Sequence, residues 1–314
     1  MYSLANKRVW VAGHNGMVGA AVCRALASEN CEILTAPREE LDLLRQSDVE
    51  DWCTQAKPDA VIICAARVGG ILANDRFPAD FIYQNLTLET NIIHSAYKAK
   101  VEKLVFLGSS CIYPKHADQP MNEDALLTGP LEATNEWYAI AKIAGIKLCQ
   151  AYRKQYGCDF ISAMPTNLYG PGDNFDLETS HVVPALIRKS YEGIKYGSEE
   201  IEIWGSGKAR REFLHVDDCA SGIIFLLKNY SGMQHVNLGT GVDITIRDLA
   251  NRITQVVGFS GKLKFDTSKP DGTPRKLLNT EHINKMGWKA EISLEKGLAD
   301  TYKYFLREWN SIHS

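Results

Sequence analysis

The chain has 314 residues, of which 45% are hydrophobic and 23% are charged, and its formal net charge is −3 at pH 7. That composition is typical of a globular protein with one large domain or two coupled ones. The weak negative charge gives no basic field for nucleic acid or an anionic membrane. Any bound phosphate must therefore be held locally, by backbone amides and a few cations.

The cysteines and the apolar runs of the sequence bear on the cellular compartment in which we expect the protein. The eight cysteines include no C-x-x-C pair, which excludes the common zinc and redox motifs, and we expect no disulfide framework. No apolar run reaches the length of a membrane span, and the first residues lack the apolar core of a secretion signal. We therefore expect a cytoplasmic protein without a membrane contact or a metal site.

Short β-branched runs alternate with helical patterns in the first half of the chain. Strands are predicted at Arg8–Ala12, Glu32–Thr35, Ala60–Ala65, Lys103–Gly108 and Phe160–Met164. The main helices are predicted at Met17–Ala27, Ala79–Lys100 and Glu136–Tyr156. Strands that are separated by helices imply βαβ crossovers. The predicted fold class is therefore α/β, a Rossmann-type doubly wound parallel sheet with helices on both faces.

The pattern changes after Pro165. Glycine and proline cluster at residues 169–172, Glu202–Trp204 has the pattern of a short strand, and residues 269–272 form a loop. We expect residues 1–165 to form the Rossmann domain and residues 166–314 to form mainly a smaller α/β substrate lobe. The apolar runs Phe213–Val216 and Val236–Leu238 predict that the chain returns to the first sheet near residues 212–240, which makes the lobe discontinuous.

A glycine triplet lies between the first predicted strand and the first helix. Gly13, Gly16 and Gly19 have the spacing of a dinucleotide-binding turn, in which the backbone approaches a pyrophosphate and the helix N-terminus stabilises it. The alternative is a tight turn without a ligand. The position at a strand–helix junction favours the cofactor.

The end of the second predicted strand bears on which nicotinamide cofactor binds. NAD enzymes usually carry an acidic residue there, whereas this chain has Thr35–Arg38, with no carboxylate and one arginine. Arg38 could pair with a 2′-phosphate, which favours NADP over NAD. The alternative is a solvated arginine that Glu39 and Glu40 partly neutralise.

Tyr138 and Lys142 have the spacing of a catalytic pair on one helix face. A lysine ammonium near the phenol is expected to lower the pKa of the tyrosine, so that it can exchange a proton with a carbonyl that receives hydride. The same spacing at Tyr191 and Lys195 is interpreted as a surface coincidence. Ser109 follows the fourth strand, where ligands bind in open α/β sheets, and its alternative role is that of a loop or cap serine.

These motifs, together with longer stretches, resemble the extended short-chain dehydrogenases/reductases that modify nucleotide sugars, and among them the GDP-L-fucose synthase family. The stretches that carry this resemblance over essentially the whole chain are Ala12–His14, Lys103–Pro114, Ala139–Leu148, Pro165–Pro171, Trp204–Gly207, Arg211–Asp218 and Ser268–Leu277. The resemblance implies NADPH-dependent conversion of GDP-4-keto-6-deoxy-D-mannose to GDP-L-fucose, by epimerisation at C3 and C5 and reduction of the C4 ketone.

The resemblance also implies roles for two residues that the spacing leaves inconspicuous. Inversion at a carbon beside a ketone needs one group to remove a proton and another to return one on the opposite face. By resemblance these groups are Cys111 and His181, which join Ser109, Tyr138 and Lys142 in the catalytic set. On spacing alone, Cys111 is an inert thiol and His181 a residue at the start of a helix.

Binding residues carry over from the same resemblance. The implied NADP(H) site comprises Gly13, Asn15, Gly16, Met17, Gly19, Arg38, Leu107, Gly108, Lys142, Pro165, Asn167, Leu168 and His181. The implied GDP-sugar site comprises Lys189, Trp204, Arg211 and Asp271. The alternatives are that Trp204 is a core residue, that Arg211 forms a surface ion pair and that Asp271 is a turn residue before a glycine. Asn15 stands where relatives carry an arginine, which weakens the preference for NADP. Lys189 also stands where relatives carry an arginine, and it keeps the positive charge but cannot make a bidentate contact with a phosphate.

The resemblance further implies a homodimer, formed through the two long helices as a four-helix bundle. Two other functions stay open. One is epimerase/reductase activity on another GDP-4-keto-sugar, such as a dideoxy or heptose form, and the other is an inactive NADP-binding scaffold.

Overall fold

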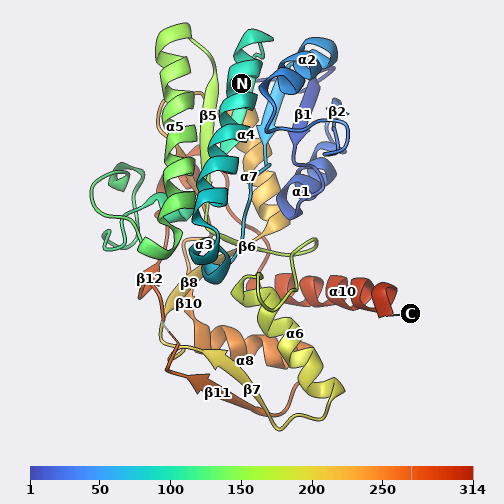
Figure 1. Cartoon of the computed structure of the whole chain (residues 1–314), viewed down its shortest axis with the longest axis vertical. Coiled ribbons are helices and arrows are strands. Elements are labelled where there is room, and N and C mark those ends of the chain that lie inside the picture. Colours follow the sequence, from blue (N-terminus) through green and yellow to red (C-terminus); the bar gives the residue numbers. More distant parts are fainter. Residues whose placement is uncertain (270, 314) are drawn as a thin grey trace.

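The computed structural model describes residues 1–269 and 271–313. Figure 1 shows a larger part, in which helices cover a sheet, and a smaller part that lies beyond the ends of its strands. The larger part holds the N-terminus, and the C-terminal helix α10 (Leu294–His313) belongs to the smaller part. No helix within the described ranges is long and apolar enough to cross a membrane.

The larger sheet is parallel throughout the described strands. Its strands are β1 (Arg8–Ala12), β2 (Glu32–Leu34), β3 (Ala60–Ile63), β4 (Lys103–Leu107), β5 (Phe160–Pro165) and β9 (Val236–Leu238). Their order is β2-β1-β3-β4-β5-β9, the doubly wound arrangement. Every residue of β3 and β4 is buried, because helices cover both faces and a central parallel strand has no face left for water. The predicted fold class is confirmed.

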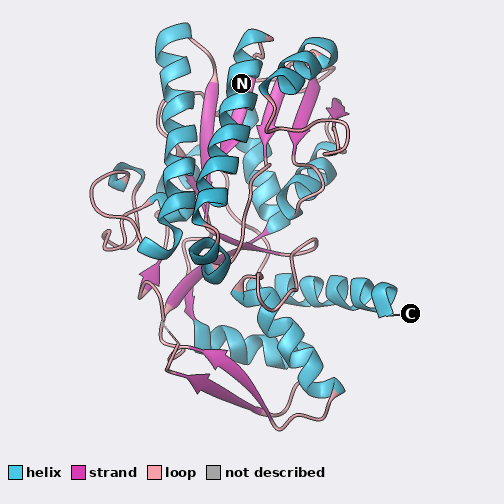
Figure 2. Ribbon diagram, in the orientation of Figure 1, coloured by secondary structure: helices cyan, strands magenta, loops and turns pink. Residues whose placement is uncertain are grey.

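Two groups of helices cover this sheet, as Figure 2 shows. On one face lie α1 (Met17–Leu26) and α7 (Val216–Asn229), and on the other lie α2 (Gln46–Ala56), α4 (Pro78–Lys98) and α5 (Glu136–Tyr156). Neighbouring strand residues contribute to opposite faces, as Ile62 and Ile63 do. The predicted bounds of α5 match the structure, and the helix ends at Gly157, whose φ of 73° is left-handed.

The smaller part contains two further sheets. β6 (Asn167–Tyr169), β8 (Arg210–His215), β10 (Asp243–Thr245) and β12 (Arg275–Lys276) form one, while β7 (Glu200–Trp204) and β11 (Lys262–Asp266) pair in parallel. Around them pack α6 (Val182–Lys195), α8 (Ile246–Val257) and α10. The remaining short elements are α3 (Ile71–Arg76), α9 (Glu281–Met286) and the 3₁₀ turns η1 (Ser110–Ile112), η2 (Glu123–Ala125) and η3 (Ala133–Asn135).

One predicted return to the larger sheet is wrong and the other is confirmed. Val236–Leu238 joins β5 as the edge strand β9, as expected. Phe213–His215 belongs instead to β8, which pairs with β6, β10 and β12 in the smaller part. The returning element is the helix α7, which begins at Val216 directly after β8 and buries its apolar face on the larger sheet. When an apolar run spans the end of a strand and the start of a helix, its pattern does not indicate with which sheet the strand pairs.

Candidate functional site

The glycine triplet forms a tight turn between β1 and α1. Gly13 has a φ of 88°, and a β-carbon on it would lie 2.6 Å from the backbone of Ala65. A β-carbon on Gly19 would lie 2.1 Å from the carbonyl oxygen of Gly13. The amides at the start of α1 receive no side-chain cap, and no acidic residue lies in the first turn. These exposed donors and the helix dipole fit the pyrophosphate of a dinucleotide.

Asn15 lies within this turn, and Arg38 lies in the loop after β2, the strand next to β1 in the sheet. Both are exposed, and Arg38 follows β2 by four residues. Among the described residues Arg38 has no ion-pair partner, so Glu39 and Glu40 do not neutralise it by direct contact. The guanidinium is therefore available to a phosphate beyond the end of β2.

The carboxyl end of β4 presents the next group of residues. Leu107 and Gly108 close the strand, and Gly108 packs so tightly against Met164 that a β-carbon would lie 2.4 Å from its Cε. The chain then turns into η1, which buries Cys111. Burial raises the pKa of the Cys111 thiol, while the positive charge of Lys276, a hydrogen bond with Ser109 and the charge of Lys142 oppose that rise.

Tyr138 and Lys142 share the face of α5 that meets this end of the sheet. Lys142 is 2% exposed, and its Nζ lies 4.7 Å from the ring centroid of Phe106 and 5.8 Å from that of Tyr138. Tyr138 packs edge-on against Phe81 of α4, with 6.4 Å between the ring centroids. The Cys111 thiol and the Tyr138 phenol interact electrostatically, so the two groups lie in one site.

The expected lowering of the tyrosine pKa is wrong for this structure. Burial, with smaller contributions from Cys111 and Glu89, holds the pKa of Tyr138 well above its ordinary value. Burial also lowers the pKa of Lys142, and the carboxylate of Glu89 lies 3.8 Å from the lysine Nζ. The lysine charge alone would lower the pKa of the phenol, but desolvation and the Glu89 carboxylate beside the lysine outweigh it.

His181 is the N-cap residue of α6. Its side chain is exposed at the surface, but the surrounding protein partly desolvates the ring and lowers its pKa. The segment before it is tied to α3, because the Gly70 amide donates to the Thr179 carbonyl at 3.1 Å. His181 therefore stands where the smaller part meets the loop that precedes α3.

The predicted substrate residues gather in the smaller part. The Nζ of Lys189 lies 5.7 Å from the ring centroid of Trp204 and donates to the Glu202 carbonyl at 2.9 Å. Trp204 is 46% exposed, and Lys269 approaches the same ring at 5.6 Å. An exposed indole between two cations is suited to stack on a flat base that carries a phosphate nearby.

Arg211 and Asp271 form a second contact group beside it. The Arg211 guanidinium donates to the Asp271 carbonyl oxygen at 3.5 Å, and burial lowers its pKa. The Asp271 carboxylate accepts hydrogen bonds from the amide and the hydroxyl of Ser206, both at 2.7 Å. Asp271 thus fastens the turn after β7, which also fixes the position of Trp204.

The chain crosses between the two parts directly after β5. Pro165 ends β5 beside Leu238, whereas Asn167 and Leu168 begin β6 beside β8. The Asn167 amide donates to the Glu212 carbonyl at 2.8 Å, which fastens this crossing. A β-carbon on Gly172 would lie 3.3 Å from the Cα of Met17, so the loop after β6 touches the start of α1.

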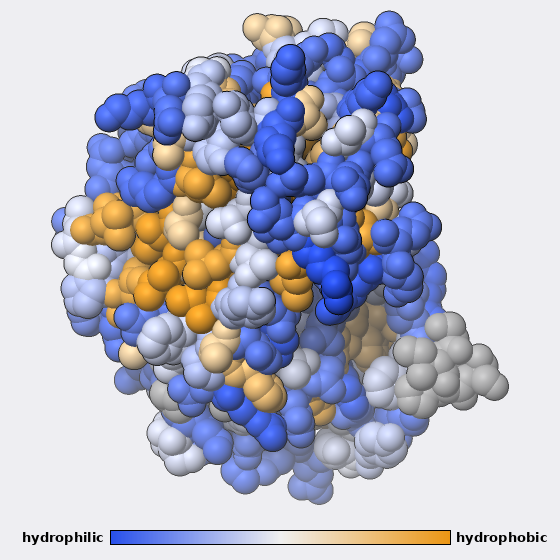
Figure 3. Space-filling view, turned by 45° about the horizontal axis from the view of Figure 1, so that its top comes forward, coloured by the Kyte–Doolittle hydropathy of each residue, from blue (hydrophilic) through white to orange (hydrophobic). Residues whose placement is uncertain are grey.

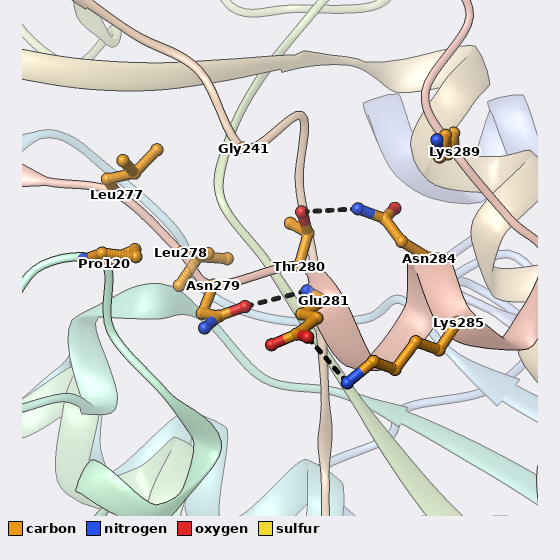
Figure 4. Close-up of a pocket in the computed structure, with 10 residues that line it drawn as sticks. All are labelled: Pro120, Gly241, Leu277, Leu278, Asn279, Thr280, Glu281, Asn284, Lys285 and Lys289. Atoms are coloured by element: carbon orange, nitrogen blue, oxygen red, sulfur yellow. Dashed lines mark hydrogen bonds and ion pairs between the residues drawn. The ribbon is translucent and has the colours of Figure 1, made fainter.

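Two features of the molecule lie outside this site. Tyr191, of the surface pair with Lys195, packs edge-on against Phe305 with 5.2 Å between the ring centroids. A pocket of about 420 Å³ lies around α9 and contains none of the predicted site residues (Figure 4). Its polar groups bind one another, since Lys285 pairs with Glu281 at 2.6 Å and Asn284 donates to Thr280.

Sequence analysis missed two charged residues at the site. Glu89 lies on α4 among residues that face the core, and a carboxylate inside such a buried stripe is a recognisable pattern. Lys276 lies on β12 and acts on Cys111 across a separation of 165 positions in the chain, for which the local sequence gives no indication.

Comparisons with known proteins agree with this geometry. Residues 9–239 match the NAD dependent epimerase/dehydratase family. The chain is 62% identical to a GDP-L-fucose synthase of Sinorhizobium fredii, covering 98% of each chain, and 56% identical to GDP-L-fucose synthase 1 of Arabidopsis thaliana, covering 96% of this chain and 93% of the relative. A GDP-L-fucose synthetase from Naegleria fowleri, solved with NADP bound, superposes with a TM-score of 0.91 at 27% identity and covers 99% of this chain and 97% of its own. The chain belongs to the NAD dependent epimerase/dehydratase family and, within it, to the GDP-L-fucose synthases.

Proposed function

We propose that this protein converts GDP-4-keto-6-deoxy-D-mannose to GDP-L-fucose, through epimerisation at C3 and C5 and NADPH-dependent reduction at C4. The observation that carries the proposal is the meeting of Cys111, Tyr138 and Lys142 at the carboxyl end of β4. A plain reductase needs the tyrosine and the lysine, whereas a second acid–base group beside them is what epimerisation requires.

Tyr138 and Ser109 act on the C4 oxygen. A phenol with a raised pKa is protonated at neutral pH, so Tyr138 can donate a proton to the oxygen as the carbonyl is reduced. During epimerisation the same oxygen carries enolate charge, which the Tyr138 and Ser109 hydroxyls stabilise by hydrogen bonds. Lys142 supplies positive charge close to the phenol.

Cys111 and His181 exchange protons with C3 and C5. Carbons beside a ketone lose a proton far more readily than other sugar carbons, because the enolate delocalises the charge. Burial of the Cys111 thiol and desolvation of the His181 imidazole by the surrounding protein favour their neutral forms, so that one group can donate a proton and the other accept one.

NADP(H) is the cofactor. It supplies the hydride for C4 when bound. Gly13, Gly16 and Gly19 cradle the pyrophosphate, with the start of α1 at Met17, and Arg38 and Asn15 face the 2′-phosphate. Along the sheet edge we assign contacts to Leu107, Gly108, Lys142, Pro165, Asn167, Leu168 and His181.

The GDP moiety binds in the smaller part, whose main body we assign to residues 166–314. Trp204 stacks on the base, and Lys189 and Arg211 neutralise the diphosphate. Asp271 holds the turn after β7 in place. Burial lowers the pKa of both cations, because a charge that is withdrawn from water is destabilised. An anionic ligand that pairs with such a cation therefore stabilises it strongly.

The test is incubation with GDP-4-keto-6-deoxy-D-mannose in deuterated buffer, with and without NADPH, followed by NMR of the product. GDP-L-fucose with deuterium at C3 and C5 is expected. A Cys111→Ser variant should lose deuterium incorporation at least about a hundredfold, because a serine hydroxyl is a far weaker acid and base. Cys53→Ser, a buried cysteine on α2, serves as the matched control.

Each other result has a definite meaning. Reduction without deuterium would show a simple 4-reductase and would remove the assigned roles of Cys111 and His181. No turnover would point to another GDP-4-keto-sugar, which a panel of dideoxy and heptose substrates would identify. Cofactor binding without turnover of any of these would indicate an inactive scaffold.

A further inference from the structure

A carboxylate lies behind the catalytic tyrosine and lysine, on the core side of the site. Glu89 of α4 is 0% exposed, and neither of its carboxylate oxygens has a hydrogen-bond partner of ordinary geometry among the described residues. An isolated buried carboxylate costs several kcal/mol or takes up a proton, so an unpartnered one needs an explanation.

The charged group beside it is the ammonium of Lys142. The Glu89 Oε2 and the Lys142 Nζ are 3.8 Å apart, and both side chains are at most 2% exposed. On its other sides this ammonium meets the rings of Phe106 and Tyr138. The chain of contacts therefore runs from Glu89 through Lys142, both of them buried, to the half-buried Tyr138.

We propose that Glu89 is a positioning residue for the reaction, whose carboxylate keeps the Lys142 ammonium charged and in place beside Tyr138. This inference rests on the proposed function only in so far as Tyr138 and Lys142 carry the proton transfer. Glu89 itself touches neither the cofactor edge nor the sugar, and it acts through the lysine.

The charges around the pair support this role. Burial raises the pKa of Glu89 to about 7, and Lys142 and the Gly145 amide oppose that rise. Burial lowers the pKa of Lys142, and Glu89 is the largest influence that raises it again, ahead of Cys111 and Cys64. Glu89 also faces Tyr138 and Cys149, whose pKa values it raises. Without Glu89, the lysine would lose its proton at a lower pH.

A second buried lysine shows what a purely structural pair looks like. Lys103 donates to Asp159 at 2.6 Å, and Asp159 also accepts hydrogen bonds from Arg153 and Ser231. That carboxylate is fully hydrogen-bonded and its pKa is lowered. Glu89 has a raised pKa, a longer ion pair and, among the described residues, no hydrogen bond of ordinary geometry, which makes it poorly suited to stabilise the fold alone.

The first experiment is the pH profile of kcat for Glu89→Gln, which keeps the shape and removes the charge. We expect the alkaline limb of the profile to move to lower pH by about one unit, an activity loss of about tenfold at pH values on that limb. The KM for the GDP-sugar should stay within about twofold, because the nucleotide contacts lie elsewhere. Asp159→Asn is the matched control: it should lose stability and keep the wild-type profile. An unshifted profile in a folded Glu89→Gln enzyme overturns the proposal.

A second measurement does not need turnover. Lys142→Met leaves the Glu89 carboxylate buried and unpaired, so its pKa rises further above the unfolded value. The free energy of unfolding of this variant should therefore fall, relative to wild type, as the pH rises above about 7, where the wild-type carboxyl ionises and the unpaired one keeps its proton. Adding Glu89→Gln should abolish that fall. Independent, additive effects of the two substitutions overturn the proposal. If the two positions couple but no GDP-keto-sugar is turned over, the proposed function fails while the pair stands.

Discussion

Desolvation by the surrounding protein moves the pKa values of Cys111 and Tyr138 upward and those of His181 and Lys142 downward. Each shift favours the uncharged form of its group, because transfer of a charge out of water is costly. The resting site thus holds a neutral thiol, a neutral phenol and a neutral imidazole, and the Lys142 ammonium, paired with Glu89, is the charge beside them. Nearby cations and the Glu89 carboxylate decide how readily each group ionises.

Lys276 offers a test of this balance at Cys111. Its positive charge is the strongest influence that opposes the rise in the thiol pKa, so Lys276→Met should raise the pKa of Cys111 further. Deuterium exchange at C3 and C5, measured against pH, should then move to higher pH, if the thiolate takes part in the exchange. Lys285→Met, which breaks a surface ion pair on α9, is the control and should leave the exchange unchanged.

We propose that the choice between NADPH and NADH depends most on Arg38. Arg38→Ala should raise the KM for NADPH by about tenfold or more, since a charge-assisted hydrogen bond contributes about 1.5–3 kcal/mol, and it should leave the KM for NADH almost unchanged. Steady-state kinetics with both cofactors measure this. Arg45→Ala, a neighbouring exposed arginine that pairs with Asp42, should affect neither. Equal loss with both cofactors would place the 2′-phosphate elsewhere.

At the scale of elements, the glycines at the junction of β1 and α1 have different roles. Gly19 is required for close packing of the backbone, whereas Gly16 leaves space that we expect the cofactor to use. Gly19→Ala would push a β-carbon into the Gly13 carbonyl, so we expect a destabilisation of about 1–3 kcal/mol and a lower Tm. Gly16 has a φ of −78°, and its nearest neighbour to an added β-carbon is 3.5 Å away. Gly16→Ala should keep the Tm and weaken only NADPH binding, as measured by fluorescence titration.

The elements also show how far sequence reasoning reaches. The larger sheet and its helices were predictable, because β-branched runs and helical periodicity alternate and each element buries one face. The position of β8 was not, since pairing with β6, β10 and β12 joins segments far apart in the chain. The spacing of Tyr138 and Lys142 and their place after the fourth strand and Ser109 predicted the pair. The neutral state of the phenol depends on desolvation and on Glu89, which that spacing does not report.

At the scale of the whole molecule, we propose that two copies associate through α4 and α5. Tyr83, Trp137 and Tyr156 on these helices are exposed, and Figure 3 shows apolar side chains gathered on the side of the molecule that carries α5. An apolar group of this kind, with exposed aromatic residues on the same helices, is typical of an interface. The two long helices are continuous surfaces that a second copy can cover.

Light scattering tests this association. A Tyr83→Lys/Tyr156→Lys variant should have the mass of one chain, because two desolvated charges would oppose association. Tyr196→Lys, an exposed tyrosine after α6 in the smaller part, should keep the mass of the unmodified protein. A single-chain mass for the unmodified protein would contradict the proposal.

The crossing after β5 has a consequence for recombination between relatives. The chain leaves the larger sheet at Pro165, builds β6, α6, β7 and β8 of the smaller part, and comes back as α7 and β9 before it leaves again. A chimaera joined once, near residue 165, would therefore carry a foreign helix and a foreign edge strand into its own nucleotide-binding core. A chimaera that exchanges the sugar specificity of two such enzymes therefore needs at least three junctions between the parent chains. No single continuous segment of the chain carries the whole pocket.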